Sequence, residues 1–209
     1  MKDDAKSERR RQIIEAAYAV LAEKGYAGTS MLAVAKRARA SNETLYSWFG
    51  SKPGLFRAMV EENARTAAEI LQEYPGGDGD PDTALSRLGP ALLRLVTSER
   101  AIALNRAAAA DSTDTGTLGR TIAASGREHI VPLLERLFAG AAAAGRLGGR
   151  TPSEAAELYI SLLIGDLQIR RVIGVAPPPD ETEIARRAER ARQIVLPPAA
   201  GSEVTARPG

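Results

Sequence analysis

SNETLYSWFGSKPGLF, residues 41–56, is the stretch that decides the fold of this chain. Ser41 is a favourable N-cap for a short helix whose first turn is polar. Aromatic residues make up only 4% of the sequence, yet Tyr46, Trp48 and Phe49 stand within four positions of one another. This arrangement predicts a helix that presents a polar start to a partner and packs its rings partly into a small core.

Apolar residues recur at spacings of three and four along almost the whole chain, which is the period of a helix with one buried face. The pattern predicts one helix ending at Gly25 and others over 31–38, 42–49, 52–74, 83–97, 99–110, 118–144, 152–173 and 180–196. Pro132 lies inside one of these segments, so a kink or break is expected there. No segment has the period-two pattern of a strand. The sequence therefore predicts an all-α fold of about nine helices.

The composition excludes several classes of site. The 209 residues contain no cysteine and one histidine, so neither disulfides nor thiolate or multi-histidine metal sites are expected. No cofactor is expected either, because the sequence has no glycine-rich phosphate loop, no metal-ligand cluster and no nucleophile–histidine–acid set. We therefore expect a protein that is not an enzyme. The absence of a long apolar run and of a signal peptide predicts a cytoplasmic protein with no membrane partner.

Charge is unevenly distributed along the chain. Residues 1–60 contain 11 basic and six acidic side chains, a net charge of +5, whereas the remainder carries −3. All lysines of the chain lie in this first part. A basic first quarter suggests that the N-terminal region contacts a polyanion, although a basic solvated surface would have the same composition.

Three short helices that end in a polar, capped one have the layout of a helix-turn-helix unit. The sequence of residues 10–57 resembles the N-terminal domain of the TetR family of bacterial repressors, and residues 159–174 resemble the penultimate helix of many members. The resemblance is carried by Ile13, Ile14, Glu15, Ala16, Ala17, Glu23, Lys24, Gly25, Tyr26, Thr29, Ser30, Val34, Ala35, Ala38, Ser41, Thr44, Leu45, Tyr46, Phe49, Lys52, Leu55 and Phe56.

The resemblance implies a domain order and a function. We expect a flexible N-terminal arm over residues 1–8, a helix-turn-helix domain over 9–54, a helical ligand-binding and dimerisation domain over 55–196, and a disordered tail over 197–209. The implied function is that of a DNA-binding transcriptional regulator. It binds a palindromic double-stranded operator as a homodimer, and a small-molecule effector releases it. Repression is preferred to activation because steric occlusion of a promoter needs no additional surface.

The second helix of a helix-turn-helix lies in the major groove, so its first residues are candidates for base contacts. Asn42 can pair with adenine, Glu43 can accept from cytosine, and Thr44 can contact a thymine methyl group. Tyr46 and Ser47 can reach phosphates, and Lys52 stands at a helix N-terminus where a phosphate is favoured. The predicted DNA-binding residues are Ser30, Lys36, Arg39, Ser41, Asn42, Glu43, Thr44, Tyr46, Ser47 and Lys52.

Several of these residues have an alternative role. Glu43 can serve only to stabilise the positive end of its helix. Ser30 and Ser41 act first as helix caps. Arg39 occupies the turn position where the family usually has glycine. If the turn keeps a left-handed backbone, a non-glycine residue there costs roughly 1 kcal/mol. We expect this strain to be tolerated, with an optional phosphate contact by Arg39.

The resemblance places the dimer interface on the last two long helices. The residues predicted to form it are Tyr159, Leu162, Leu163, Asp166, Ile169, Ile184, Ala188, Ala191 and Val195. The alternative is that these faces form only the core of the monomer.

The resemblance also implies an effector pocket among the helices over 55–144, and a lipophilic effector. Its candidate contacts are the polar residues Asn105, Arg106 and His129. An alternative function is a helical regulatory module that acts through a protein partner instead of a small ligand.

Overall fold

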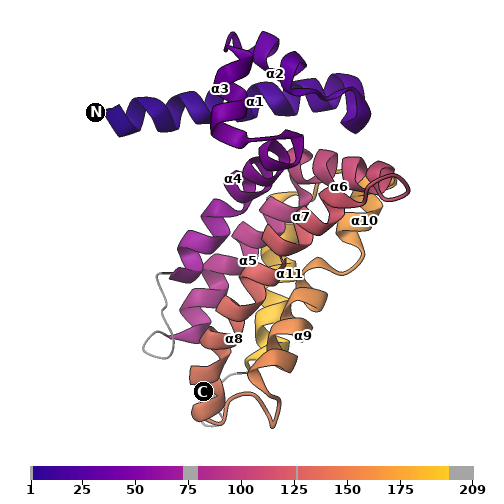
Figure 1. The fold of residues 1–209 in the computed structure, drawn as a ribbon. Helices are drawn as coiled ribbons and strands as arrows, with labels where there is room; N and C mark the ends of the chain where they lie inside the picture. Colours follow the sequence, from indigo (N-terminus) through magenta and orange to yellow (C-terminus); the bar gives the residue numbers. More distant parts are fainter. Residues whose placement is uncertain (1, 73–79, 126, 198–209) are drawn as a thin grey trace, which may run out of the picture. The chain divides into compact units, whose positions relative to one another are not determined.

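The computed structural model describes residues 2–72, 80–125 and 127–197, and every regular element in these ranges is an α-helix (Figure 1). The helices are α1 (Lys2–Gly28), α2 (Met31–Ala38), α3 (Asn42–Phe49), α4 (Lys52–Gln72), α5 (Pro81–Thr97), α6 (Glu99–Asp111), α7 (Thr117–Ser125), α8 (Arg127–Ala143), α9 (Pro152–Ile164), α10 (Leu167–Val172) and α11 (Glu181–Val195). The predicted all-α fold is confirmed. One predicted helix, over 152–173, is divided into α9 and α10.

Two predicted helices contain a residue that disfavours helix. The predicted helix over 118–144 is described as α7 and α8, on either side of residue 126, and Pro132 lies inside α8. A proline removes one helical hydrogen bond, yet α8 continues through this residue, so no helix break falls at Pro132. The predicted helix over 152–173 ends at Gly165, where φ is 53°. That backbone conformation favours glycine and breaks the helical hydrogen-bond ladder.

The predicted N-terminal arm is corrected by the structure, because α1 begins at Lys2 and runs through residues 2–8. Glu8 makes an ion pair with Arg11 and accepts a hydrogen bond from Gln12 at 3.4 Å. Such pairs at spacings of three and four support a helix. Gly25 has φ 66°, so regular helix is interrupted where the sequence predicts its end. The predicted disordered tail lies, apart from Pro197, outside the described residues.

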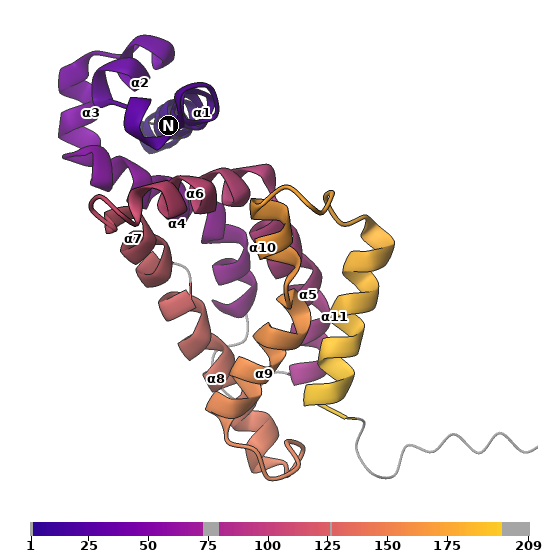
Figure 2. The same ribbon diagram turned by 90° about the vertical axis from the view of Figure 1, so that its right-hand side faces the viewer.

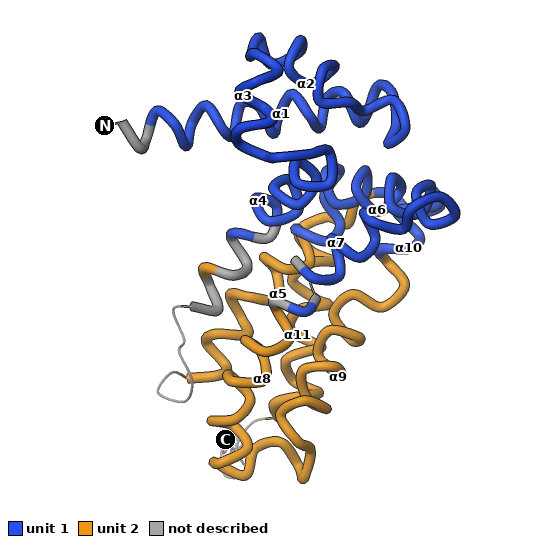
Figure 3. The backbone as a smooth tube through the Cα atoms, viewed as in Figure 1, with its two compact units in different colours: residues 1–65, 95–129, 168–177 blue, residues 66–94, 130–167, 178–209 orange. Residues whose placement is uncertain are grey.

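The chain forms two compact units of interleaved segments (Figure 3). Unit 1 comprises residues 1–65, 95–129 and 168–177, and unit 2 comprises 66–94, 130–167 and 178–209. The boundary predicted between residues 54 and 55 therefore falls inside unit 1. Helices α6, α7 and most of α10 belong with the helix-turn-helix rather than with the rest of the C-terminal region.

Unit 1 has one core shared by the helix-turn-helix and by α6 and α7. Leu45, Leu55 and Phe56 are fully buried, and Leu104 of α6 joins the same cluster. Figures 1 and 2 show α2 and α3 on one side of α1 and the start of α4 on another. The buried Tyr18 hydroxyl donates to the Met59 carbonyl at 2.9 Å, which fixes α1 against α4.

Unit 2 contains a tightly packed contact among α5, α9 and α11. A Cβ placed on Gly89 of α5 would lie 2.7 Å from the Tyr159 hydroxyl and 2.9 Å from the Ala188 Cβ. The rings of Tyr159 and Phe138 meet edge to face, with centroids 6.2 Å apart. Only glycine allows the helices to approach this closely at residue 89.

This packing corrects the predicted dimer interface. Six of its residues are buried in the core of unit 2 and are not available to a second chain: Tyr159, Leu163, Ile184, Ala188, Ala191 and Val195. These six positions fit the monomer-core alternative, and Tyr159 and Ala188 both pack against Gly89 of α5. Asp166 and Ile169 are exposed, and Leu162 is half-buried.

Candidate nucleic-acid interface

Helices α2 and α3 begin and end where the sequence predicts, because local caps define them. The Ser30 Oγ accepts a hydrogen bond from the Ala33 N–H at 3.1 Å, and the Ser41 Oγ accepts one from the Thr44 N–H at 3.0 Å. Each serine satisfies a backbone donor that the first turn of a helix leaves free. Both serines therefore act as caps, which was one of their two predicted roles.

The turn between α2 and α3 has a left-handed backbone at Arg39, with φ 49° and ψ 46°. Two backbone hydrogen bonds close the end of α2, from Arg39 N to Lys36 O at 3.3 Å and from Ala40 N to Ala35 O at 3.0 Å. The turn geometry usual with glycine is thus kept although glycine is absent. The strain expected at a non-glycine residue is therefore present.

Arg9 of α1 stabilises this turn, and sequence reasoning missed it. Its Nη2 donates to the carbonyl oxygens of Ala38 and Arg39, each at 2.9 Å. These contacts neutralise carbonyls at the negative end of α2. No local signal separates Arg9 from its neighbours in the run RRR, because only the packing of α1 brings it beside the turn.

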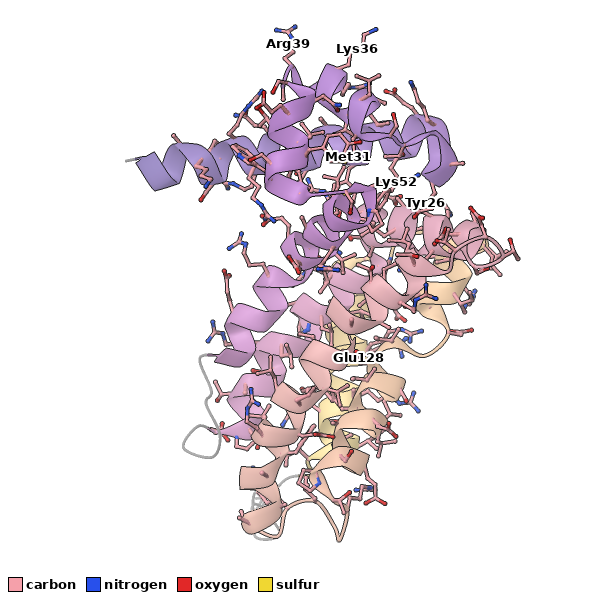
Figure 4. All side chains as sticks on the ribbon, viewed as in Figure 1. Tyr26, Met31, Lys36, Arg39, Lys52 and Glu128 are labelled. Atoms are coloured by element: carbon pink, nitrogen blue, oxygen red, sulfur yellow. The ribbon has the colours of Figure 1, made fainter. Side chains whose placement is uncertain are left out.

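Most of the predicted DNA-binding side chains are exposed on α2, the turn and α3. The exposed residues are Ser30, Lys36, Arg39, Ser41, Asn42, Glu43, Tyr46 and Ser47, and Thr44 is half-buried. Figure 4 shows Lys36 and Arg39 projecting into solvent. On the opposite face of α3, Leu45 and Phe49 are buried and Trp48 is half-buried. The structure therefore leaves the polar start of α3 accessible while its apolar side packs into unit 1.

Lys52 is placed differently from the other predicted contacts. Its Nζ donates to the Tyr26 carbonyl oxygen at 2.5 Å and lies 4.0 Å from the centroid of the Tyr26 ring (Figure 4). Burial lowers the pKa of Lys52, and the nearby carboxylates of Asp111 and Asp114 oppose that shift. The ammonium group fastens α4 to the end of α1, an intramolecular role that the sequence did not reveal.

Asp111 organises the connection from α6 to α7 in the same unit. It is buried, and its carboxylate accepts from the Leu118 N–H at 3.0 Å and from the Thr115 hydroxyl at 2.8 Å. The hydrogen bond from Leu118, followed by those from Thr115, lowers the pKa of this carboxyl.

The predicted effector-binding residues do not lie together. Asn105 lines a recess of about 90 Å³ in unit 1, together with Val60, Asn63, Leu95, Val96, Ala101, Leu104, Ile122 and Gln168. Arg106 lines a separate groove, and its guanidinium donates to the carbonyls of Val172 at 2.7 Å and Arg171 at 3.0 Å. Arg106 thus holds α10 against α6. The His129 side chain lies outside the described residues.

Two further features concern the described part of the chain. None of its helices is both long enough and apolar enough to cross a membrane. Among the same residues, no group of three or more histidine or carboxylate side chains is arranged to hold a metal ion.

Comparison with known protein families gives two matches. The family model for the C-terminal domain of AefR-like transcriptional repressors matches residues 83–197, and the model for bacterial regulatory proteins of the tetR family matches residues 13–59. The HTH-type regulator YvkB of Bacillus subtilis (strain 168), which is uncharacterized, is 30% identical over 83 residues. That match covers 40% of this chain and 42% of YvkB, so the chain matches less than half of this relative's length.

Solved structures share the fold over most of the chain. A TetR transcriptional regulator from Agrobacterium tumefaciens is 26% identical with a TM-score of 0.67, and the match covers 87% of this chain and 90% of that one. The flavonoid-responsive regulator FrrA is 28% identical with a TM-score of 0.64, and the match covers 92% of this chain and all of FrrA (100%).

Proposed function

Because the chain belongs to the TetR family of bacterial regulators, we propose that it represses transcription by binding a palindromic operator as a homodimer and is released by a small-molecule effector. The chain is a transcriptional regulator with a helix-turn-helix DNA-binding domain and is not an enzyme. The observation that carries the proposal is the exposed polar first turn of α3 on a capped, rigid helix-turn-helix. The match to a repressor family over residues 83–197 supports repression.

In the proposed complex, the start of α3 reads bases in the major groove. Asn42 is exposed and can donate and accept at the edge of an adenine. Tyr46 and Ser47, further along the helix, are placed for contacts to phosphate, which position the protein without reading sequence. Lys36 and Arg39 add exposed positive charge around the turn.

Dimerisation follows from the need to read two half-sites about one helical turn of DNA apart, roughly 34–36 Å, or a multiple of it. The buried residues of α9 and α11 cannot supply the contact, so the interface needs exposed apolar side chains. Ile169, Ile173 and Val175 are 56%, 63% and 62% exposed. Neighbouring exposed apolar residues of this size are typical of protein–protein contacts. We assign the contact with a second copy to α10 and the residues that follow it.

The effector site that we propose is the recess beside Asn105. Its lining is mainly apolar, which suits a lipophilic molecule, and Asn105 and Gln168 supply polar groups. The Nδ2 of Asn105 donates to Ala101 O at 2.8 Å, which leaves its carbonyl oxygen available for a ligand donor. Small-molecule sites usually measure about 300–1,000 Å³, so an effector would have to enlarge this recess. Binding would then favour a second conformation over the DNA-competent one.

The first experiment is selection of bound fragments from a random DNA pool at about 0.1–0.15 M salt, which suppresses non-specific phosphate binding. Enrichment of a palindrome is the expected result. Asn42→Ala should relax the preference at one base position of each half-site, whereas Tyr46→Ala should weaken binding to all sequences alike. A folded protein that enriches no sequence would refute the proposal and favour action through a protein partner.

The effector is tested on the operator so obtained. Flavonoids are the first probes, because the structural relative FrrA is flavonoid-responsive. Displacement of the wild-type protein from DNA is expected, and Asn105→Leu should weaken displacement while operator affinity is unchanged. Equal displacement of both proteins would exclude the recess beside Asn105 as the site.

A further inference from the structure

A basic recess lies between α1 and α4, two helices whose arrangement Figures 1 and 2 show. Its volume is about 330 Å³, and it is lined by Ser7, Arg10, Arg11, Ile14, Glu62 and Arg65. Among the described residues, three guanidinium groups and one hydroxyl surround it, against a single carboxylate, so these side chains carry a net charge of +2. None of these residues belongs to the predicted operator contacts or to the recess beside Asn105.

Arg10 is held in place without using its hydrogen-bond donors. Its guanidinium carbon lies 5.4 Å from the centroid of the Phe49 ring, and that ring is buried at the end of α3. Among the described residues, no carboxylate lies within ion-pair distance of Arg10. Stacking on an aromatic ring fixes the plane of a guanidinium while its N–H groups stay directed outward. Arg10 is therefore an oriented donor without an anionic partner among the described side chains.

The other charged residues of the recess take part in two ion pairs. Arg11 pairs with Glu8, and both side chains are more than half exposed. Glu62, the acid among the described lining residues, lies 3.7 Å from Arg65 and is thereby partly neutralised. Exposed pairs of this kind are weak, about 0–1 kcal/mol, so a multivalent anion can replace them.

The chemistry of the lining selects the ligand class. A guanidinium presents a planar fork of N–H donors that matches phosphate oxygens two at a time. A phosphate monoester carries a charge of about −1.5 to −2 at neutral pH, close to the charge of the lining. We propose that the recess between α1 and α4 is a binding site for a phosphate group, with Arg10 as its central donor.

The dimensions and place of the recess favour a phosphorylated small molecule over the DNA backbone. Its volume reaches the lower limit of small-molecule sites, about 300 Å³, which exceeds the need of a lone phosphate. The exposed Lys36 and Arg39 project from α2 and the turn (Figure 4), whereas the residues that line the recess belong to α1 and α4. A molecule such as a nucleoside diphosphate would place its phosphates among the arginines, and the recess has volume left for its remaining part.

The test is calorimetric titration of inorganic pyrophosphate, and separately of adenosine diphosphate, into the full-length protein without DNA at about 0.1 M salt. Binding is expected for the wild type and should be weaker by about tenfold or more in Arg10→Gln and in Arg11→Gln, which each remove a charge-assisted contact. Arg57→Gln is the matched control, because it removes a positive charge from exposed α4 surface outside the recess. That variant should bind like the wild type.

A second arm identifies the source of the phosphate. The same variants are titrated with random duplex DNA over a range of salt concentrations. Loss of pyrophosphate binding with DNA affinity equal to that of Arg57→Gln identifies a free phosphorylated ligand. The alternative is that the wild type does not bind pyrophosphate, and that the salt dependence of DNA binding falls by about one more unit of slope in Arg10→Gln than in Arg57→Gln. That result identifies a DNA phosphate in the recess.

The proposal is overturned if Arg10→Gln, Arg11→Gln and Arg57→Gln behave alike in both arms. Circular dichroism checks that each variant is folded. If loss of the stacking on Phe49 unfolds Arg10→Gln, the more exposed Arg11→Gln decides. The outcome is independent of the operator, so a failure to enrich a palindrome leaves this test intact.

Discussion

The left-handed Arg39 allows a prediction in which stability and DNA binding change in opposite directions. Replacing Arg39 by glycine relieves a backbone strain of about 1–2 kcal/mol, since φ 49° and ψ 46° are unfavourable for any residue with a Cβ. Glycine also gains about 0.4–1 kcal/mol of conformational freedom in the unfolded chain, which reduces the benefit. Compared with Arg39→Ala, Arg39→Gly should therefore be more stable by about 0.5–1 kcal/mol.

Arg39→Ala is the matched control, because both variants remove the charge and only glycine removes the strain. Thermal unfolding should show a melting temperature about 1–4 °C higher for Arg39→Gly than for Arg39→Ala. Both variants should lose DNA affinity equally, with the salt slope reduced by about one if Arg39 contacts a phosphate as proposed. A melting temperature of Arg39→Gly equal to or below that of Arg39→Ala would refute the assignment of strain to this turn.

Three further predictions concern stability. Gly89→Ala should lower the free energy of unfolding by about 1–3 kcal/mol in urea titrations, because its Cβ would meet the Tyr159 hydroxyl at 2.7 Å. An unchanged urea concentration at the midpoint of unfolding would contradict the close packing. Arg171→Met should lower the free energy of unfolding by about 1–3 kcal/mol, because the Nε and Nη2 of this buried guanidinium donate to Thr97 O at 3.2 and 3.1 Å. A smaller loss than in an exposed substitution such as Arg186→Met would contradict this role. The folded-state pKa of Asp111 is lowered, so its contribution to stability is present above the unfolded aspartate pKa of about 3.9 and is lost as pH falls below it. Asp111→Asn should therefore unfold with a weaker dependence on pH in the acid range, and an unchanged acid transition would contradict the role assigned to this carboxylate.

The elements that could be predicted from sequence are those defined by local interactions. Helices α2 and α3 match their predicted bounds because Ser30 and Ser41 bond within three residues of their own positions. The burial of Leu45 and Phe49 follows from their spacing of four on α3, which places both on one face. The exposed polar start of α3 follows from the same period.

The positions of helix breaks were harder to predict. Pro132 is a strong signal for a break and yet lies inside α8, whereas Gly165, a weaker signal, ends α9. A proline or glycine raises the free energy of helix formation at its own position. Packing against other helices then decides whether that cost is tolerated.

The sequence by itself determined the all-α class, the helix-turn-helix and the residues at the start of α3, because caps, turns and helical periods act over a few positions. Only the tertiary structure decided which apolar faces are buried inside the monomer, as for Ile184 and Ala188, and which charged groups are used internally. By sequence Lys52 and Arg9 look as available to DNA as the other basic residues of the first 60 positions, yet both bond to backbone carbonyls of residues 26 to 30 positions away. Contacts between distant segments depend on how whole helices pack, and no local pattern carries that information.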